Sequence, residues 1–327
     1  MPGRTWAANT GFTITYPARA AVTWPLWIAQ EKGFFARHGL DAKLIFGAHP
    51  AGIATVVSGE AQMTPYSVEQ LLATAVRSPD LVIKSIPLLH APFIMIGRPD
   101  VRTPAALKGK RIGISRLGDA NYFYSLDVLA KAGLTAADVQ WVPTGGDVAV
   151  RAKMLRNNML DAAFLAVQHT FAMKEDGFVQ IIDLADDSDI YMTLGNAFSR
   201  KWADKNPDVI ERAIMAQSQA TKFFYDNKAE SIDIYRKYDE QPADILAKVY
   251  DIYAGNAHHE RIPLATLPPL AFAARRMAND VPEIAKFDLR SIVDNSIVKK
   301  LIHAGFFADL YGDSVLKEQK AKLEAAI

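Results

Sequence analysis

Cysteine is absent from this chain, and so are several features of familiar protein classes. The 327 residues contain no Cys, which excludes disulfide bonds, thiolate nucleophiles and Cys-ligated zinc or iron–sulfur sites. A chain without thiols suits an oxidising compartment, although many cytosolic proteins also lack Cys. No window of about 18 apolar residues occurs, so we expect no membrane-spanning helix.

Charge of one sign is not in excess either. Lys and Arg together number 37 and Asp and Glu 36, which gives a net charge of +1 at pH 7. Nucleic-acid binding needs a concentrated basic surface, and the most basic short stretch, Lys108 to Arg111, holds only three charges. We therefore expect no nucleic-acid partner.

The signatures of common catalytic and metal sites are also missing. The chain has no G-x-S-x-G, no G-x-x-x-x-G-K and no H-E-x-x-H. His258 and His259 are adjacent, so their side chains leave on different faces, and the acidic run from Asp183 to Asp189 lacks the alternation, Gly and distal Glu of a calcium loop. We therefore predict no catalytic residue, no metal site and no cofactor.

What the sequence does contain is an alternation of apolar strands and amphipathic helices. This alternation predicts an α/β fold with mostly parallel sheets flanked by helices. The pattern becomes almost wholly helical after Asn206 and Pro207, which together form a helix start. Strands are expected at 12–16, 41–46, 62–65, 81–89, 93–96, 111–115, 139–142, 162–166 and 179–184. Helices are expected at 25–35, 51–58, 68–76, 103–107, 119–132, 148–156, 231–237, 243–253, 264–277 and 291–307.

Length and a weak internal echo indicate two lobes. A chain of 327 residues is long for a single core. Residues 56–62 and 154–161 both follow the order helix end, turn, strand, at equivalent places in two units. We expect lobe 1 to comprise 1–97 and 197–327 and lobe 2 to comprise 98–196. Ligands of open α/β sheets bind outside the carboxyl ends of the strands, which places the site in a cleft between the lobes.

The loop after Ser115 is the strongest candidate for ligand chemistry. It joins a strand end to a helix N-terminus, where unpaired backbone N–H groups carry partial positive charge. Gly118 permits close approach, and Ser115 and Arg116 supply hydrogen-bond donors, which predicts a site for a carboxylate, sulfonate or phosphate. The alternative is that Asp119 only caps the helix and Arg116 is solvated.

Aromatic residues and histidines near the ends of expected strands are further candidates for ligand contacts. Tyr16, Trp24 and Trp27 lie within twelve residues, and such aromatic side chains either line an organic ligand or pack within a lobe. We expect Trp24 to be more exposed than Trp27. His49 and His90 follow strands, and each is either an anion donor or an ordinary surface residue.

The segment from Pro25 to Asp41, PLWIAQEKGFFARHGLD, resembles the signature of the nitrate/sulfonate/taurine type of periplasmic binding proteins, approximately P-x-aromatic-x-A-x-x-x-G-F-F-x-x-x-G-L. Three more segments resemble that family in the same order, and the match covers about residues 12–225. These segments are 51–61 with its S-G-x-A, 107–115 with LKGKRIGIS, and 133–139 followed by 154–165.

The resemblance implies a two-lobed periplasmic-binding-protein fold of type II with a helical C-terminal region. It implies the solute-binding component of an ABC import system that captures a small organic anion. The aromatic side chains and Arg116 favour an aromatic or heteroaromatic carboxylate as that ligand, with a sulfonate next. The lobes would hinge near Ile96–Arg98 and Leu194–Phe198. The protein would be a monomer that meets an ABC permease. The alternatives are an enzyme on the same scaffold, such as a phthalate-type decarboxylase, and a sensor.

The resemblance also implies a location and a set of contacts. Residues 1–11 have neither the basic start nor the apolar run of a signal peptide, so we expect a mature periplasmic form with its signal peptide removed, or else a cytoplasmic protein. Ligand contacts are expected at strand ends. Lobe 1 would supply Tyr16, Trp24, Ala48, His49, Tyr66, Ser67 and His90, and lobe 2 would supply Ser115, Arg116, Asp119, Asn121, Gly145, Gly146, Ala166 and Gln168.

Three departures from the family pattern stand out. Asp119 occupies a position where the family often has Ser or Thr, next to the anionic end of the ligand, so its carboxylate would repel an anion or bind a polar or cationic group. Gln62 replaces an Asp, and Asn158 replaces a Gly whose left-handed backbone angles Asn tolerates. We expect these last two to be structural.

Overall fold

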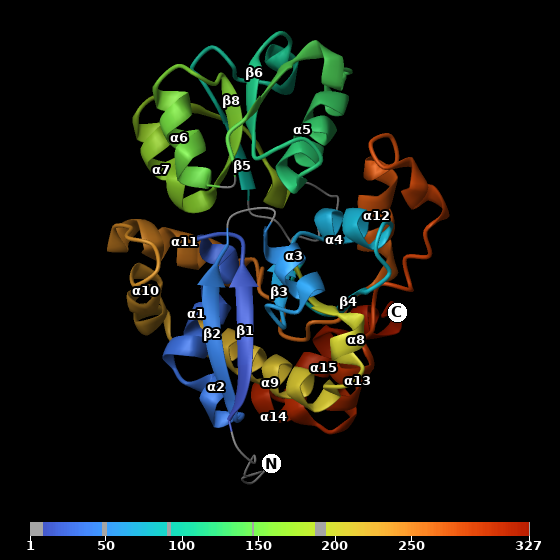
Figure 1. The fold of residues 1–327 in the computed structure, drawn as a ribbon. Helices are drawn as coiled ribbons and strands as arrows, with labels where there is room; N and C mark the ends of the chain where they lie inside the picture. Colours follow the sequence, from blue (N-terminus) through green and yellow to red (C-terminus); the bar gives the residue numbers. More distant parts are fainter. Residues whose placement is uncertain (1–8, 48–50, 90–92, 146, 187–193, 327) are drawn as a thin grey trace.

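The chain forms two α/β bodies, one above the other in Figure 1. The structure is a computed structural model that describes residues 9–47, 51–89, 93–145, 147–186 and 194–326. Each body has a central sheet with helices on its faces, as the alternation of strands and helices predicts. None of the helices among the described residues is both long and apolar enough to cross a membrane.

The lower body is built on five strands. β1 and β2 pair in parallel, and β1 reaches β3 through a parallel bridge between Ile14 and Met63. β10 then lies antiparallel between β3 and β4, which gives the order β2-β1-β3-β10-β4. The strands are β1 (Thr10–Tyr16), β2 (Leu40–Phe46), β3 (Thr64–Tyr66), β4 (Leu81–Leu88) and β10 (Leu194–Ser199).

The upper body repeats this topology. β6 pairs in parallel with β7 and β8, while β5 lies antiparallel between β8 and β9, in the order β7-β6-β8-β5-β9. In each sheet the fourth strand runs against its neighbours. The strands are β5 (Phe93–Gly97), β6 (Arg111–Ile114), β7 (Gln140–Pro143), β8 (Ala162–Ala166) and β9 (Val179–Asp183).

The sheet pairings shift the expected lobe boundaries at 97/98 and 196/197. All of Phe93–Gly97 belongs to the upper sheet, and all of Leu194–Ser199 belongs to the lower one. The expected hinges at Ile96–Arg98 and Leu194–Phe198 therefore overlap sheet strands. An apolar run such as Phe93–Gly97 does not reveal which sheet it will join, so the expected boundaries fall at the end of the first of these strands and inside the second.

The internal echo has a structural counterpart. The backbone N–H of Gln62 donates to Thr13 O at 2.9 Å and its side-chain Oε1 accepts from Thr13 N at 2.7 Å. In the upper body Asp161 N donates to Arg111 O at 2.9 Å, and Asp161 Oδ2 accepts from Arg111 N at 2.8 Å. The same pair of bonds thus joins the segment before β3 to β1 in the lower body and the segment before β8 to β6 in the upper body. Asn158 adopts the left-handed conformation, with φ of 64°.

Helices cover both sheets, and the C-terminal region is helical as expected. Two expected helices are each split at a glycine in the left-handed region, Gly33 at φ 64° and Gly305 at φ 78°. The helix after β8 was not expected. The helices are α1 (Trp24–Glu31), α2 (Phe34–Arg37), α3 (Ala51–Ser58), α4 (Val68–Ala75), α5 (Ala120–Lys131), α6 (Val148–Arg156), α7 (Val167–Glu175), α8 (Arg200–Ala203), α9 (Pro207–Asp226), α10 (Lys228–Arg236), α11 (Ala243–Gly255), α12 (Leu267–Met277), α13 (Ser296–His303), α14 (Phe306–Tyr311), α15 (Ser314–Glu318) and α16 (Lys320–Glu324).

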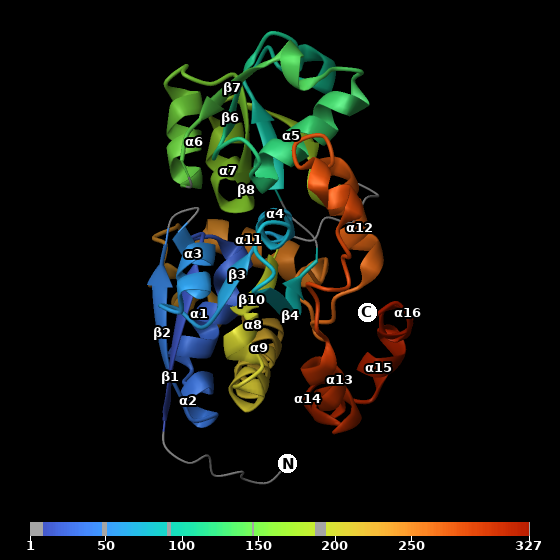
Figure 2. The ribbon, with the colours of Figure 1, turned by 45° about the vertical axis from the view of Figure 1, so that its right-hand side comes forward.

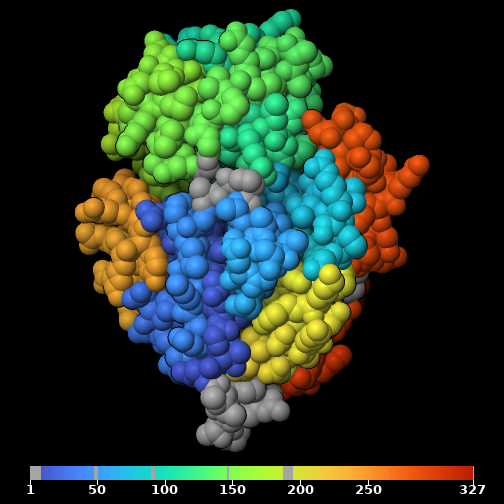
Figure 3. Space-filling model, viewed as in Figure 1, coloured from blue at the N-terminus to red at the C-terminus, as the bar shows by residue number. Residues whose placement is uncertain are grey.

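Two of the C-terminal helices flank the junction between the bodies. α12 packs on α4 of the lower body and also contacts α5 of the upper one, while α11 contacts α7. Figures 1 and 2 both show α12 beside α4 and below α5. In the space-filling view the upper body rests on the lower one, with orange C-terminal segments on either side (Figure 3).

Candidate functional site

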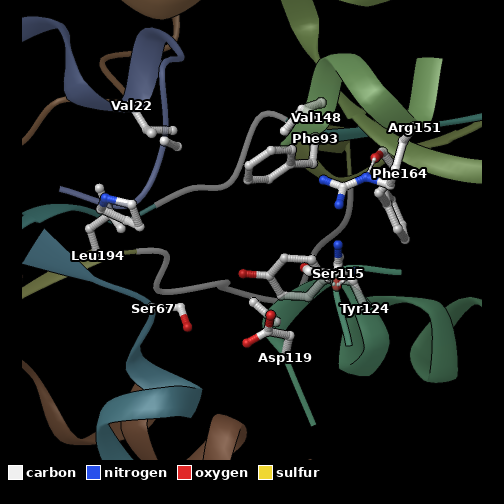
Figure 4. Close-up of a pocket in the computed structure, with 14 residues that line it drawn as sticks. Val22, Ser67, Phe93, Ser115, Asp119, Tyr124, Val148, Arg151, Phe164 and Leu194 are labelled. Atoms are coloured by element: carbon white, nitrogen blue, oxygen red, sulfur yellow. Dashed lines mark hydrogen bonds between the residues drawn. The ribbon is translucent and has the colours of Figure 1, made fainter. Parts of the chain in front are cut away.

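A cavity lies where the two sheets face each other, and both bodies line it. The space inside it is about 660 Å³ when the open solvent at its mouth is included. The 14 lining residues are drawn in Figure 4. They are Pro17, Ala18, Val22, Ser67, Phe93, Ser115, Asp119, Ala120, Asn121, Tyr124, Val148, Arg151, Phe164 and Leu194.

The position of these residues follows from the topology. Pro17 and Ala18 come directly after β1, and Ser67 comes after β3 and precedes α4. Ser115 follows β6, and Asp119 is the N-cap residue of α5. The strands that carry these loops are parallel in each sheet, so their carboxyl ends lie at one edge and the loops converge there.

Most of the cavity wall is apolar. Tyr124 from α5 stands between Phe93, the first residue of β5, and Phe164 of β8, with ring centroids 6.4 Å and 6.1 Å away. Val22, Val148 and Leu194 add aliphatic surface. Such a wall favours a ligand with a planar or apolar body.

One cation is built into this apolar wall. Arg151, the fourth residue of α6, is only 4% exposed, and Figure 4 shows its guanidinium pointing toward Phe93 and Tyr124. Its Nε donates to Phe164 O at 3.2 Å, while Nη1 has no hydrogen-bond partner in the described part of the chain. Burial lowers the pKa of Arg151 to about 10, and the carboxylates of Asp119 and Asp147 oppose that shift. Arg151 therefore keeps its charge at neutral pH and has a donor to offer to an anion.

Asp119 is the buried carboxylate of the site. It is 1% exposed, its side chain makes no capping bond to α5, and its Oδ1 lies 3.5 Å from Arg116 Nε. Two guanidinium groups, Arg116 and Arg151, thus share one carboxylate. Arg151, Asp119 and Arg116, whose side chain is 41% exposed, together carry a net charge of +1, which a monoanionic ligand would neutralise.

Smaller polar groups complete the wall. Asn121 Oδ1 accepts from both the backbone N and the Oγ of Ser115, at 3.3 Å and 3.1 Å. This fixes the amide orientation, so the NH₂ group of Asn121 remains to donate elsewhere. Ser67 is 5% exposed, and its Oγ has no partner in the described residues. Each of these groups can meet a polar atom of a ligand.

The structure brings four of the expected contacts together, Ser67, Ser115, Asp119 and Asn121, which all line the cavity. Arg116 lies beside it, where its Nη2 donates to Gln70 Oε1 of the lower body at 2.6 Å. Arg116 therefore connects the two bodies and holds Asp119. Ala48, His49, His90 and Gly146 lie outside the described residues.

Three expected lobe-1 contacts lie behind the cavity wall. Trp24 is as fully buried as Trp27, at 0% exposed, so the expectation that Trp24 is the more exposed is wrong. Its indole Nε1 donates to Ser231 O at 2.7 Å, and its ring packs on Tyr235. Tyr16 packs edge-on against Trp27. Tyr66 is fully buried, and burial, with help from the Asp119 carboxylate, raises the pKa of its phenol.

Three expected lobe-2 contacts also fall outside the lining set. Gly145 takes φ of 77° and donates to Ser115 O at 3.2 Å, so it shapes the loop. Ala166 ends β8 and is buried. Gln168 in the first turn of α7 is 2% exposed, and neither end of its amide has a partner among the described residues.

Sequence reasoning missed Arg151 and the aromatic wall. A signal for Arg151 was available, because a basic residue in the first turns of a helix opposes the helix dipole and is unfavourable without a specific partner. Phe93, Tyr124 and Phe164 carried no such signal, since their apolar spacing is the same as that of core residues.

Among the described residues, no group of three or more His, Asp or Glu is placed to hold a metal ion. His258 and His259 are both 2% exposed and pack on Tyr253. Burial, followed by the neighbouring His258, lowers the pKa of His259 to about 3. His259 is therefore a neutral core residue at physiological pH.

Comparison with known proteins places the chain in a family. The model of the family described as NMT1/THI5 like matches residues 21–231, well over half of the chain. The chain belongs to the NMT1/THI5-like family. The matched segment includes every residue that lines the cavity except Pro17 and Ala18, and it ends before α11 and α12.

Relatives of this NMT1/THI5-like chain include binding proteins. A curated Brucella abortus protein that carries the name of a binding protein is 26% identical over 244 residues, covering 73% of this chain and 74% of its own. The periplasmic aliphatic sulphonate-binding protein SsuA of Escherichia coli superposes with a TM-score of 0.72 at 17% identity, covering 87% of this chain and 92% of SsuA.

Two further solved structures show the range of proteins on this fold. The periplasmic nitrate-binding protein NrtA of Synechocystis has a TM-score of 0.72 at 14% identity over 90% of this chain and 89% of NrtA. The desulfurization enzyme DSZB has a TM-score of 0.64 at 16% identity over 90% of this chain and 99% of DSZB. At these identities the superpositions establish the periplasmic-binding-protein fold alone.

Proposed function

We propose that this protein is the periplasmic solute-binding component of an ABC import system, and that it captures a small organic monoanion between its two bodies. An aromatic or heteroaromatic carboxylate is the favoured ligand, and a sulfonate is next. The observation that carries the proposal is the buried guanidinium of Arg151, which directs an unused N–H into a cavity with a mostly apolar wall.

The chemistry of the cavity supports an anion with an apolar body. Burying an arginine away from water is costly unless an anion compensates it. A carboxylate or sulfonate near Arg151 would supply that compensation, with Ser67 and Asn121 as further donors. The rings of Phe93, Tyr124 and Phe164 would contact the rest of the ligand, which a bare inorganic anion such as nitrate would leave unfilled.

The relatives support the transport role. The Brucella abortus relative is named a binding protein, and SsuA and NrtA are periplasmic binding proteins for a sulphonate and for nitrate. We propose that this chain has the same role and acts as a monomer. Closure of the two bodies over the ligand would form the surface that a membrane permease binds.

A thermal-shift screen against small carboxylates, sulfonates and aromatic acids tests the proposal. A ligand at a hundredfold excess over its dissociation constant stabilises the protein by about 2.7 kcal/mol, which raises the melting temperature by a few degrees. We expect aromatic monoanions to give the largest shifts. Neutral analogues of the same shape, such as the methyl esters, serve as matched controls and should give none.

Recovery of the ligand separates transport from catalysis. DSZB shows that enzymes exist on this fold. Each compound that stabilises the protein is therefore incubated with it and extracted, and its molecular mass is measured by mass spectrometry. Unchanged mass supports the binding role. A mass that changes only when the protein is present would show that the protein is an enzyme. Equal shifts in melting temperature for esters and acids would contradict the proposal that the ligand is an anion.

A further inference from the structure

The clearest link between the two bodies outside the cavity is a buried ion-pair cluster on α12. Arg276 Nη2 donates to Glu69 Oε1 of α4 at 2.6 Å, and its Nη1 donates to Asp127 Oδ2 of α5 at 2.6 Å. Glu69 belongs to the lower body and Asp127 to the upper one. Figure 2 shows the three helices meeting there. One guanidinium therefore connects a carboxylate from each body.

The cluster is buried enough to be strong. The Arg276 side chain is 6% exposed, Glu69 is fully buried and Asp127 is 21% exposed. Burial raises the pKa of Glu69, and the charge of Arg276 opposes that rise. Arg276 and Glu69 form a pair within the lower body, and Asp127 is the partner that the upper body adds.

The same arginine reaches the wall of the ligand cavity. Its Cζ lies 5.1 Å from the ring centroid of Tyr124, which lines that cavity. Asn121, Tyr124 and Asp127 are spaced by three residues on α5, so they share one stripe of the helix. The first two members of the stripe face the ligand space, and the third is held by Arg276.

Further polar bonds lie along the same junction. Tyr122 of α5 donates to Asp280 Oδ1 at 3.2 Å, just after α12. In the loop that precedes α5, Arg116 donates to Gln70, the neighbour of Glu69 in α4. Contacts from the lower body thus border α5 at several points, and the Arg276 cluster is the most buried of them.

We propose that Arg276 is a positioning residue of the ligand site, which through Asp127 and Tyr124 fixes α5 in the orientation that closes the cavity. The proposal rests on the proposed function for its effect on affinity. It assigns to the C-terminal helix α12, which lies outside the segment matched by the family model, a direct part in ligand retention.

The Asp127→Asn variant tests this without disturbing the lower body, because the Arg276–Glu69 pair remains. We expect the affinity for the best ligand of the screen to fall about tenfold, mainly through faster dissociation. The matched control is Asp176→Asn, which removes the Arg156–Asp176 pair within the upper body and should leave affinity unchanged. A lower melting temperature for Asp127→Asn with wild-type dissociation kinetics would mean that the cluster is only structural, and would overturn the proposal.

A second measurement needs no ligand. Because the chain has no cysteine, Ala130→Cys on α5 and Glu283→Cys after α12 can carry a pair of spin labels in an otherwise wild-type background. We expect the distance distribution between them to broaden toward longer distances when Asp127→Asn is added. An unchanged distribution would contradict the positioning role. If the screen finds no ligand, the proposed function fails while this measurement still decides the role of Arg276.

Discussion

Arg151 is the residue on which the account of ligand binding depends most. It lies in the first turns of α6, where the helix dipole disfavours a cation, and it is 4% exposed with an N–H directed into the cavity. A position that is poor for stability and well placed for an anion indicates selection for binding. Trp24 shows the converse, since its polar atom is already bonded to Ser231 and its ring is packed in the core.

Replacing Arg151 should separate affinity from stability. We expect Arg151→Gln to weaken binding of the anionic ligand about 100-fold, because a buried charge-assisted contact is lost. The melting temperature of the ligand-free variant should change little, since a buried charge is removed while Asp119 keeps Arg116 as its other cationic neighbour. Isothermal titration calorimetry and thermal denaturation measure the two effects.

The control for this change lies on the same helix. Arg156→Gln alters an exposed arginine that pairs with Asp176 on the surface, and it should leave affinity unaltered. Equal affinity of Arg151→Gln and the wild type would remove Arg151 from the site.

At the scale of elements, the two halves repeat one construction. The bonds that Gln62 makes to Thr13 are matched by those that Asp161 makes to Arg111. Asp161 does more, because its carboxylate also accepts from Nε and Nη2 of Arg111 at 3.0 Å and 2.9 Å. Glutamine at 62 preserves the backbone bond that the family's Asp would make.

The repeated construction gives a graded stability prediction. We expect Gln62→Ala to lower the unfolding free energy by about 1 kcal/mol, the usual net value of one hydrogen bond. Asp161→Ala should cost about 2–3 kcal/mol, since the charged bonds to Arg111 are lost as well. Urea denaturation measures both, and ligand affinity should not change. A larger cost for Gln62→Ala would contradict this reading of the echo.

Much of the element order could be predicted from the sequence, because periodicity and turn residues are local. The limits of β8 and α6 were predicted to the residue, and Asn158 has the left-handed angles that its place in the turn requires. Pairing is not local. The sequence did not show that Phe93–Gly97 and Leu194–Ser199 would be the antiparallel strands of opposite sheets.

The candidate site was predictable where loops signal it and not where the wall is apolar. Glycine and polar residues after a strand end marked Ser115, Asp119 and Asn121, which line the cavity. Tyr124 and Phe164 reach the same space from a helix and a strand, and their burial within a body or between bodies is decided only by tertiary packing.

At the scale of the whole molecule, acid stability reflects histidines that the fold keeps neutral. The pKa of His259 is lowered to about 3 in the folded chain, against about 6.5 in an unfolded one. The unfolded chain therefore binds the extra proton first. Above about pH 6.5 protonation of His259 does not reduce the unfolding free energy. As the pH drops from there toward 3, the unfolding free energy falls by at most about 1.4 kcal/mol per pH unit for this one group.

This prediction is checked by urea denaturation between pH 7 and pH 4. We expect His259→Gln to flatten the decline, because glutamine has no proton to take up. His303→Gln, at the exposed C-terminal end of α13, is the matched control and should keep the wild-type slope. Identical slopes in all three proteins would show that His259 does not govern acid sensitivity.

The central claim is that an organic anion binds between the two bodies with its charge on Arg151. The most direct measurement is a crystal structure of the protein with the best ligand of the screen. The account predicts an oxygen of the anionic group within hydrogen-bond distance of Arg151 Nη1, with the ligand body against Phe93, Tyr124 and Phe164. A ligand bound elsewhere, or one whose anionic group points away from Arg151, would contradict it.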